Sequence, residues 1–161
     1  MSLPGLMPER MAFMRHRQKQ QQETRDGRTT KPIPRGLSKR VVNGQLLYAP
    51  VVTVVPGKLV FLSGILSRNS KGEIVGRGDM RAQIRQVFSN ITIALAAAGA
   101  TWADVVKRQS FTMAIDAYFE HIDARMEFCG DDLSTSTAVE VRRLSHPDFL
   151  VEVEVLAVIK A

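Results

Sequence analysis

Cysteine is nearly absent from this sequence. Cys129 is the only one in 161 residues, so the chain forms no intramolecular disulfide and has no cysteine cluster for a metal. Neither His121 nor His146 stands at a metal-ligand spacing from a second ligand, and we expect no metal and no cofactor. A chain without disulfides suits a reducing compartment, which predicts a cytoplasmic protein.

Long apolar runs are also missing. No stretch approaches the roughly 18 apolar residues that cross a bilayer. Arg10, Arg15 and Arg17 interrupt any apolar core that an N-terminal signal would need. The sequence therefore predicts neither a membrane span nor a secretory signal.

The positive charge gathers at one end of the chain. Residues 1–40 hold ten Lys or Arg and three acidic residues, a net charge of +7, whereas residues 41–161 carry a net charge of −1. We interpret residues 1–40 as a basic extension, either mobile or docked on a neighbouring subunit through Met7, Met11 and Met14. Residues 41–161 form the folded domain, and their near-neutral charge argues against a nucleic-acid partner.

Short strands are predicted to open the folded domain. Asn43 and Gly44 lie between two apolar runs and indicate a tight hairpin. A second hairpin is expected around Pro56 and Gly57, pairing residues 51–55 with residues 58–62.

Two helices, separated by a strand over 105–113, are predicted next. Asp79 is a good N-cap for the first helix and Gly99 is a plausible end. Asp116 is the expected N-cap of the second helix, and Gly130 stands just past its end. The apolar positions expected to face the core are Ile84, Val87, Phe88, Ile91, Leu95 and Ala98 in the first helix, and Phe119, Ile122 and Met126 in the second.

The C-terminal segment predicts a final pair of strands joined by a turn over 144–148. Residues 151–155 alternate valine with glutamate, which places Glu152 and Glu154 on the face opposite the valines. Strands with two helices between them are typical of an α+β fold, in which one mixed sheet is covered by two helices. The other sheet face would then need cover, and an oligomer supplies it.

A series of short motifs runs in order from about Val41 to Lys160. They are Gln45-Leu-Leu-Tyr48-Ala-Pro50, Gly57-Lys-Leu-Val-Phe-Leu-Ser63-Gly64, Gly78-Asp79 with Gln83 and Val87-Phe88-Ser-Asn90-Ile91, Ala97-Ala-Gly99-Ala100 with Asp104-Val-Val-Lys107, and Ser136-Thr-Ala-Val-Glu-Val141 with Leu150-Val-Glu152-Val-Glu154. Together they resemble the RidA/YjgF family, also called endoribonuclease L-PSP-like.

This resemblance implies a chorismate-mutase-like α+β sandwich and a homotrimer whose sheets pack into a central β-barrel. Three clefts between the subunits would each hold a small metabolite. The activity it implies is hydrolysis of reactive enamines and imines to a 2-oxo acid and ammonia. Some members of the family are described as ribonucleases.

The resemblance also implies roles for individual residues. Glu152 matches the carboxylate that positions water, and Tyr48 matches the cleft tyrosine. The implied ligand contacts are Ser63 and Gly64 at the end of a strand, Asp123 on the second helix, and Ala138 beside Ser136.

Two positions depart from the family pattern. Ser136 stands where the family has the arginine that grips the substrate carboxylate, and Ile65 replaces the usual glutamine after Ser-Gly. A serine cannot supply a bidentate guanidinium, and losing one buried charged partner costs about 2–5 kcal/mol. Arg68 is the first candidate for a relocated arginine.

Three functions therefore stay open at this point. The first is a divergent trimer that binds a small metabolite and hydrolyses simple 2-imino acids poorly. The second is an active imine deaminase with a relocated arginine. The third is an RNA-acting protein that uses the basic extension, although the charges of this extension lack the interleaved aromatic side chains that single-strand binders use.

Overall fold

The computed structural model of the chain describes residues 34–38, 40–130 and 132–160. The predictions for residues 1–33, including the methionine stripe, lie outside the described residues. None of the helices in the described ranges is long and apolar enough to cross a membrane.

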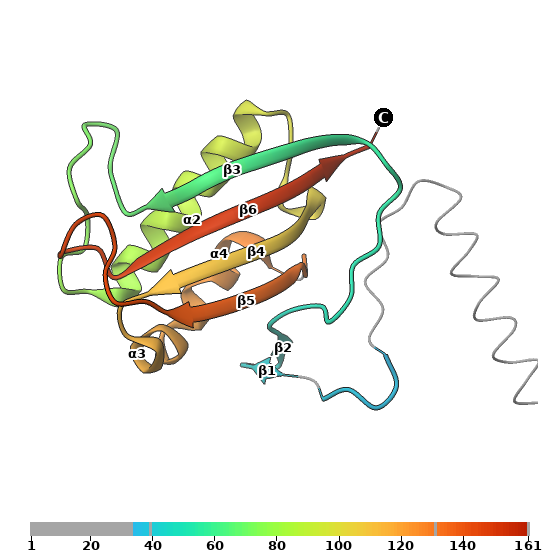
Figure 1. Cartoon of the computed structure of the whole chain (residues 1–161), viewed down its shortest axis with the longest axis horizontal. Coiled ribbons are helices and arrows are strands. Elements are labelled where there is room, and N and C mark those ends of the chain that lie inside the picture. Colours follow the sequence, from blue (N-terminus) through green and yellow to red (C-terminus); the bar gives the residue numbers. More distant parts are fainter. Residues whose placement is uncertain (1–33, 39, 131, 161) are drawn as a thin grey trace, which may run out of the picture.

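A four-stranded sheet forms the body of the domain (Figure 1). Its strands are β3 (Lys58–Leu66), β4 (Val105–Thr112), β5 (Thr135–Glu140) and β6 (Val151–Ile159), in the spatial order β3-β6-β4-β5. β4 and β5 are parallel and the other neighbours are antiparallel. The mixed sheet with helices that the sequence predicts is therefore confirmed.

The prediction that the last two strands pair with each other is wrong. β4 lies between β5 and β6, with Ser110 opposite Val153 on one side and opposite Ala138 on the other. The period-two patterns of β5 and β6 predict which side chains share a face, but they do not identify the neighbouring strand. That choice depends on contacts between residues far apart in the chain.

The first predicted hairpin is present and the second is not. β1 (Val41–Val42) and β2 (Gln45–Leu46) pair across Asn43 and Gly44, both of which have positive φ. Residues 51–55 form no strand in the described chain, although Thr53 makes an isolated bridge. Pro56 fixes φ near −65°, whereas a two-residue hairpin turn needs a positive φ at this position.

Helix α2 (Met80–Ala97) carries most of the helical core. Asp79 caps it by accepting a hydrogen bond from the Ala82 backbone N–H, as predicted. The predicted apolar stripe is confirmed, because five of its members are at most 1% exposed: Ile84, Val87, Phe88, Ile91 and Leu95. At roughly 1.5–3 kcal/mol per buried side chain, this stripe is a main source of the stability of the domain.

The second predicted helix is broken into three pieces. They are α3 (Ile115–Glu120), a 3₁₀ turn η2 (Ile122–Arg125) and α4 (Met126–Cys129). The N-cap is Ala114 rather than Asp116. Of the three residues predicted to face the core, Ile122 is buried, whereas Phe119 and Met126 are partly buried and pack against the core. The other buried residues of this region are Tyr118, Ala124, Arg125 and Cys129.

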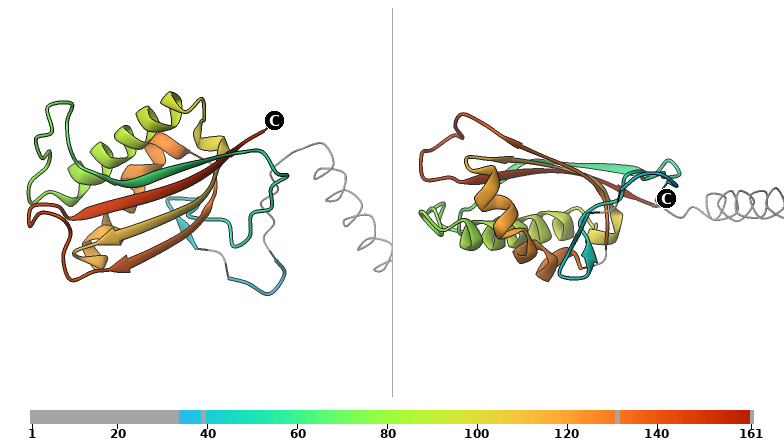
Figure 2. Two further views of the ribbon diagram at one scale, coloured as in Figure 1. Left: turned by 45° about the horizontal axis from the view of Figure 1, so that its top comes forward. Right: turned by 90° about the horizontal axis from the view of Figure 1, so that it is seen from below.

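The two faces of the sheet differ in their cover. Helices α2, α3 and α4 all lie on one side, the helix-covered face (Figure 2). No helix of the described residues lies on the opposite side, the bare face. The residues of the bare face are Leu59, Phe61, Lys107, Gln109, Phe111, Thr137, Val139, Glu152, Glu154 and Leu156.

Candidate functional site

One half of the predicted site lies on the bare face, where β3 meets β6. The pairing of these strands shifts register between Leu62 and Ile65, a bulge that contains Ser63 and Gly64. A Cβ at Gly64 would lie 1.7 Å from Oε1 of Glu152. The Glu152 carboxylate therefore rests against the Gly64 backbone in space that any other residue at position 64 would fill.

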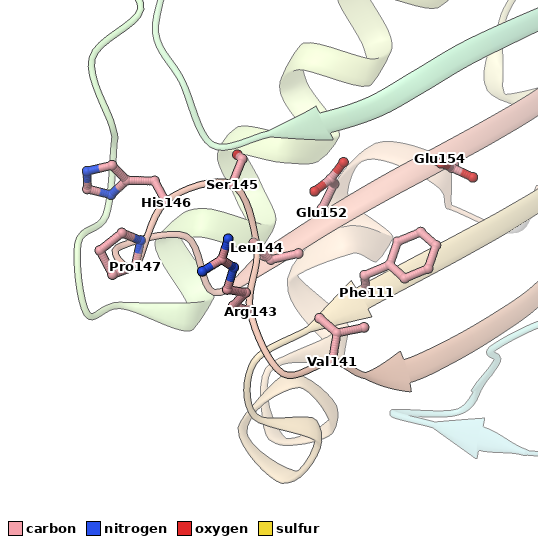
Figure 3. A pocket seen from close by; sticks show the side chains of 9 residues that line it. All are labelled: Phe111, Val141, Arg143, Leu144, Ser145, His146, Pro147, Glu152 and Glu154. Carbon is pink, nitrogen blue, oxygen red and sulfur yellow. The ribbon is translucent and has the colours of Figure 1, made fainter.

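The surroundings of Glu152 on the bare face change the pKa of its carboxyl. Burial raises the pKa of Glu152, and the nearby charge of Glu154 raises it further. Both carboxylates line an open hollow of about 730 Å³, together with Phe111 and the loop after β5. Figure 3 shows the two glutamates standing on β6 and Phe111 on β4, with Arg143 and His146 on the loop.

The other half of the predicted site lies on the helix-covered face. A smaller cavity of about 220 Å³ is bounded by the segment after β2, by α3 and η2, and by β5. Its lining residues are Arg40, Leu47, Tyr48, Tyr118, Phe119, Ile122, Arg125, Ser136 and Ala138. The lining includes two arginines and three hydroxyl groups but no carboxylate.

Two buried arginines meet at the carbonyl oxygen of Leu47, and of the two only Arg125 lines this cavity. Arg108 on β4 is 2% exposed and Arg125 on η2 is 4% exposed. Both donate through Nη2 to the carbonyl oxygen of Leu47, over 3.3 Å in the case of Arg108. Two donors on one oxygen lie within about 6 Å of each other, where like charges repel by about 3 kcal/mol at an effective dielectric constant of about 20.

The pair has few partners among the described residues. Arg108 also donates to Sγ of Cys129 at 3.4 Å, but no described carboxylate pairs with either guanidinium, and the Nε of each is buried without a partner. Burial lowers the pKa of Arg125 to about 10, and the positive charge of Arg108 contributes to the shift.

The structure divides the predicted residues into two groups. Gly64 and Glu152 come together on the bare face, with Ser63 in the same bulge as Gly64, whereas Tyr48, Ser136 and Ala138 come together on the helix-covered face. The side chain of Ile65 packs against the core instead. A sheet separates the two groups, so they do not form one cavity within a chain.

Asp123 and Arg68 are each engaged elsewhere. Asp123 accepts two hydrogen bonds from Arg81, at 2.9 and 2.7 Å, and this ion pair lowers the pKa of its carboxyl. Arg68 donates to the Gly72 carbonyl at 2.7 Å, and its guanidinium lies 4.8 Å from the ring centroid of Phe149. It follows β3, three strands from Ser136, or about 14 Å by strand spacing.

Sequence reasoning missed Arg108, Arg125 and Tyr118. A signal was present in β4, where the period of two groups Arg108 with Ser110 and Thr112. In the second helix, Tyr118, Ile122, Arg125 and Cys129 follow the helical spacing of a buried stripe. This stripe is not recognised from the sequence, because it includes Arg125 and arginine is usually exposed.

A mixed sheet with helices on one face defines the chain as an α+β protein, with an acid-lined hollow on the bare face and a cationic cavity under the helices. The family model described as endoribonuclease L-PSP matches residues 45–159. The chain therefore belongs to the RidA/YjgF family.

Individual relatives agree with this assignment. A RutC family protein of Pyrococcus horikoshii is 35% identical over 102 residues, 63% of this chain and 79% of that protein. A 2-iminobutanoate/2-iminopropanoate deaminase of Dermatophagoides farinae is 28% identical over 126 residues, 76% of this chain and 98% of the relative. Among solved structures, the Rid family protein YyfB of Yersinia pestis, of unknown function, has a TM-score of 0.71 and 25% identity, over 81% of this chain and 98% of that one.

Proposed function

We propose that this chain forms a homotrimer that hydrolyses a small imine in three clefts between its subunits. The observation that carries the proposal is the separation of the two groups of predicted residues by the sheet. Glu152 lies on the bare face and Tyr48 and Ser136 lie on the helix-covered face. A ligand that contacts both groups therefore needs two copies of the chain.

The bare face supports the assembly. Phe61 is 74% exposed and Leu59 is 56% exposed, and Val139 adds a third exposed apolar side chain on β5. Exposed apolar side chains on one sheet face favour association with another copy. In the chorismate-mutase-like arrangement implied by the family, three such faces close into a central barrel.

The proposed chemistry uses Glu152 as the base. The pKa of Glu152 is raised toward neutral pH. A general base is most effective when its pKa lies near the pH at which the enzyme works. Glu152 accepts a proton from water while the water oxygen bonds to the imine carbon. Glu152 passes the proton it has taken to the imine nitrogen, which gives a carbinolamine. The hydroxyl proton of the carbinolamine then moves through Glu152 to the amino nitrogen, and the C–N bond breaks to release ammonia and leave a 2-oxo acid. Tyr48 covers the bound ligand from the neighbouring subunit.

Mixing two inactive variants tests the proposal. Glu152→Gln removes the base on the bare face, and Ala138→Leu fills the cavity on the helix-covered face. If each site combines halves from two chains, a mixed trimer regains some complete sites, and we expect about a quarter of the wild-type rate. The assay is ammonia release from an enzymatically generated imine, and light scattering should give the mass of three chains.

A matched control mixes Ala138→Leu with Tyr48→Phe. Both changes affect the helix-covered half, so this mixture should stay as slow as its components. A mixture of Glu152→Gln and Ala138→Leu that is no faster than its components, or a wild type that stays monomeric, would contradict the shared site.

RNA cleavage is not part of the proposal. Residues 41–161 carry a net charge of −1 and offer little attraction to a phosphate backbone. We expect purified protein to cleave RNA weakly or not at all. Strong cleavage that disappears in a site variant would overturn this expectation.

A further inference from the structure

We propose that Arg108 and Arg125 form the carboxylate receptor of this site, and that its ligand is a small acid with two carboxylates. The inference rests on the proposed function for the position of the reacting carbon. The receptor itself, however, lies within a single chain, so it can be tested separately from the assembly.

The first argument is the unmet charge. Both guanidinium groups are almost fully buried, both have an Nε without a partner, and the described residues supply no carboxylate to either. Burying a charge without an opposite charge is strongly unfavourable. Their shared hydrogen bonds to the Leu47 carbonyl satisfy part of their donor capacity but do not neutralise them. An anion in the cavity would complete this arrangement.

The second argument is position. Arg108 on β4 lies directly opposite Ser136 in the parallel register with β5, so the two side chains lie on the same sheet face. Ser136 and Arg125 both line the cavity. Guanidinium groups are therefore available beside Ser136. They come from Arg108 on the neighbouring strand and from Arg125 on η2, instead of from β5. The serine leaves room for these two longer side chains.

The third argument is the amount of charge. A single carboxylate would neutralise only one of the two buried guanidinium groups. Arg40 adds a third at the rim, where its Cζ lies 3.9 Å from the ring centroid of Phe119. The cavity of about 220 Å³ holds the volume of roughly seven water molecules. A compact acid with two charges fits both the charge and the size.

Binding of succinate to the full chain tests the inference, measured by calorimetry and by the rise in melting temperature. Butyrate has the same number of carbons and one carboxylate, and succinamide has none. We expect succinate to bind about ten- to a hundredfold more tightly than butyrate, the range of one charge-assisted hydrogen-bonded pair. Succinamide should bind most weakly.

Two substitutions link the binding to the arginine pair. Arg108→Met and Arg125→Met should each abolish the succinate-induced rise in melting temperature. Without ligand, each should raise the melting temperature, because each removes an unpaired buried charge. Arg125→Lys keeps the charge but loses the planar fork, so its succinate affinity should lie between wild type and Arg125→Met.

The matched control is Arg85→Met. Arg85 is an exposed arginine paired with Glu127 at 2.6 Å, and its loss should leave the response to succinate unchanged. If Arg108→Met and Arg125→Met bind succinate like wild type, the receptor is wrong. If phosphate or butyrate binds as tightly as succinate, the assignment of two carboxylates is wrong.

A third outcome would identify the pair as purely structural. In that case Arg125→Lys would strongly lower the melting temperature, and no acid would stabilise the wild type. The mixing experiment with Glu152→Gln and Ala138→Leu does not depend on which acid binds. A failure of the arginine receptor can therefore be told apart from a failure of the shared site.

Discussion

Charge is buried on the helix-covered face of the sheet, whereas apolar side chains are exposed on the bare face. Arg108 and Arg125 are at most 4% exposed, while Phe61 is 74% exposed. Charged side chains are usually exposed and large apolar side chains are usually buried, so each face departs from this rule in its own way. Among the described residues, no carboxylate pairs with the buried guanidinium groups and no helix covers the bare face. We propose that a ligand completes the helix-covered face and that a second copy of the chain completes the bare face.

The strongest way to break this comparison is to make the bare face polar. Phe61→Glu would place a carboxylate where we propose that subunits pack, and an unpaired buried charge strongly opposes association. We expect assembly to be lost and imine hydrolysis with it, as measured by light scattering and ammonia release. Ile93→Glu is the control, because Ile93 is an exposed apolar residue on α2. A trimer that survives Phe61→Glu would remove the bare face from the interface.

The next largest effect concerns the two glutamates of the bare face. Glu152→Gln should lower the rate of imine hydrolysis by about 10²- to 10⁴-fold, the usual contribution of a general base. Glu154→Gln changes an exposed neighbour on the same strand and should leave most of the rate. Equal losses in both variants would mean that the acidic hollow acts through its overall charge.

Moving an arginine sharpens the comparison on the other face. By sequence alone, Ser136→Arg is expected to raise activity. With Arg108 opposite Ser136 in the structure, we now expect it to crowd the arginine pair and lower the melting temperature. The exchange Arg108→Ser with Ser136→Arg keeps the number of charges and should recover at least about tenfold in succinate affinity over Arg108→Ser alone. If affinity does not recover, an arginine on β5 cannot replace the one on β4.

The smallest effect is a dependence of stability on pH. The pKa of Glu152 is raised in the folded chain, so its contribution to stability is present at low pH and is lost as pH rises through the folded pKa. Glu152→Gln removes this loss. Thermal unfolding of both proteins should show little difference near pH 4 and a growing advantage of the variant toward neutral pH. A difference that does not change with pH would contradict the shift.

The sequence predicts elements well where one residue pattern decides the structure. The stripe from Ile84 to Leu95 and the alternation from Val151 to Val155 both match the observed burial. It fails where a partner far along the chain decides. β5 pairs with β4 because of contacts across the sheet. The missing strand at residues 51–55 has a local cause instead, because Pro56 does not allow the predicted turn.

For the candidate site, the structure brings some of the predicted residues together and separates others. Glu152 and Gly64 are predicted together and lie together. The family resemblance predicts that Ser136 stands where an arginine is expected. The two arginines beside it come from β4 and η2, and neither is near it in sequence. No local pattern links them, because they meet only after the sheet and the broken helix have formed.

The position of β6 has a consequence for how the protein is made. β6 lies between β3 and β4, yet it follows every other strand in the chain. During synthesis, β3 and β4 therefore emerge without the strand that joins them, and both keep open edges until residues 151–159 leave the ribosome. The four-stranded sheet can form only after this segment has been translated. A chain truncated before it would leave β3 and β4 unpaired with each other, and their open edges would make it prone to aggregate.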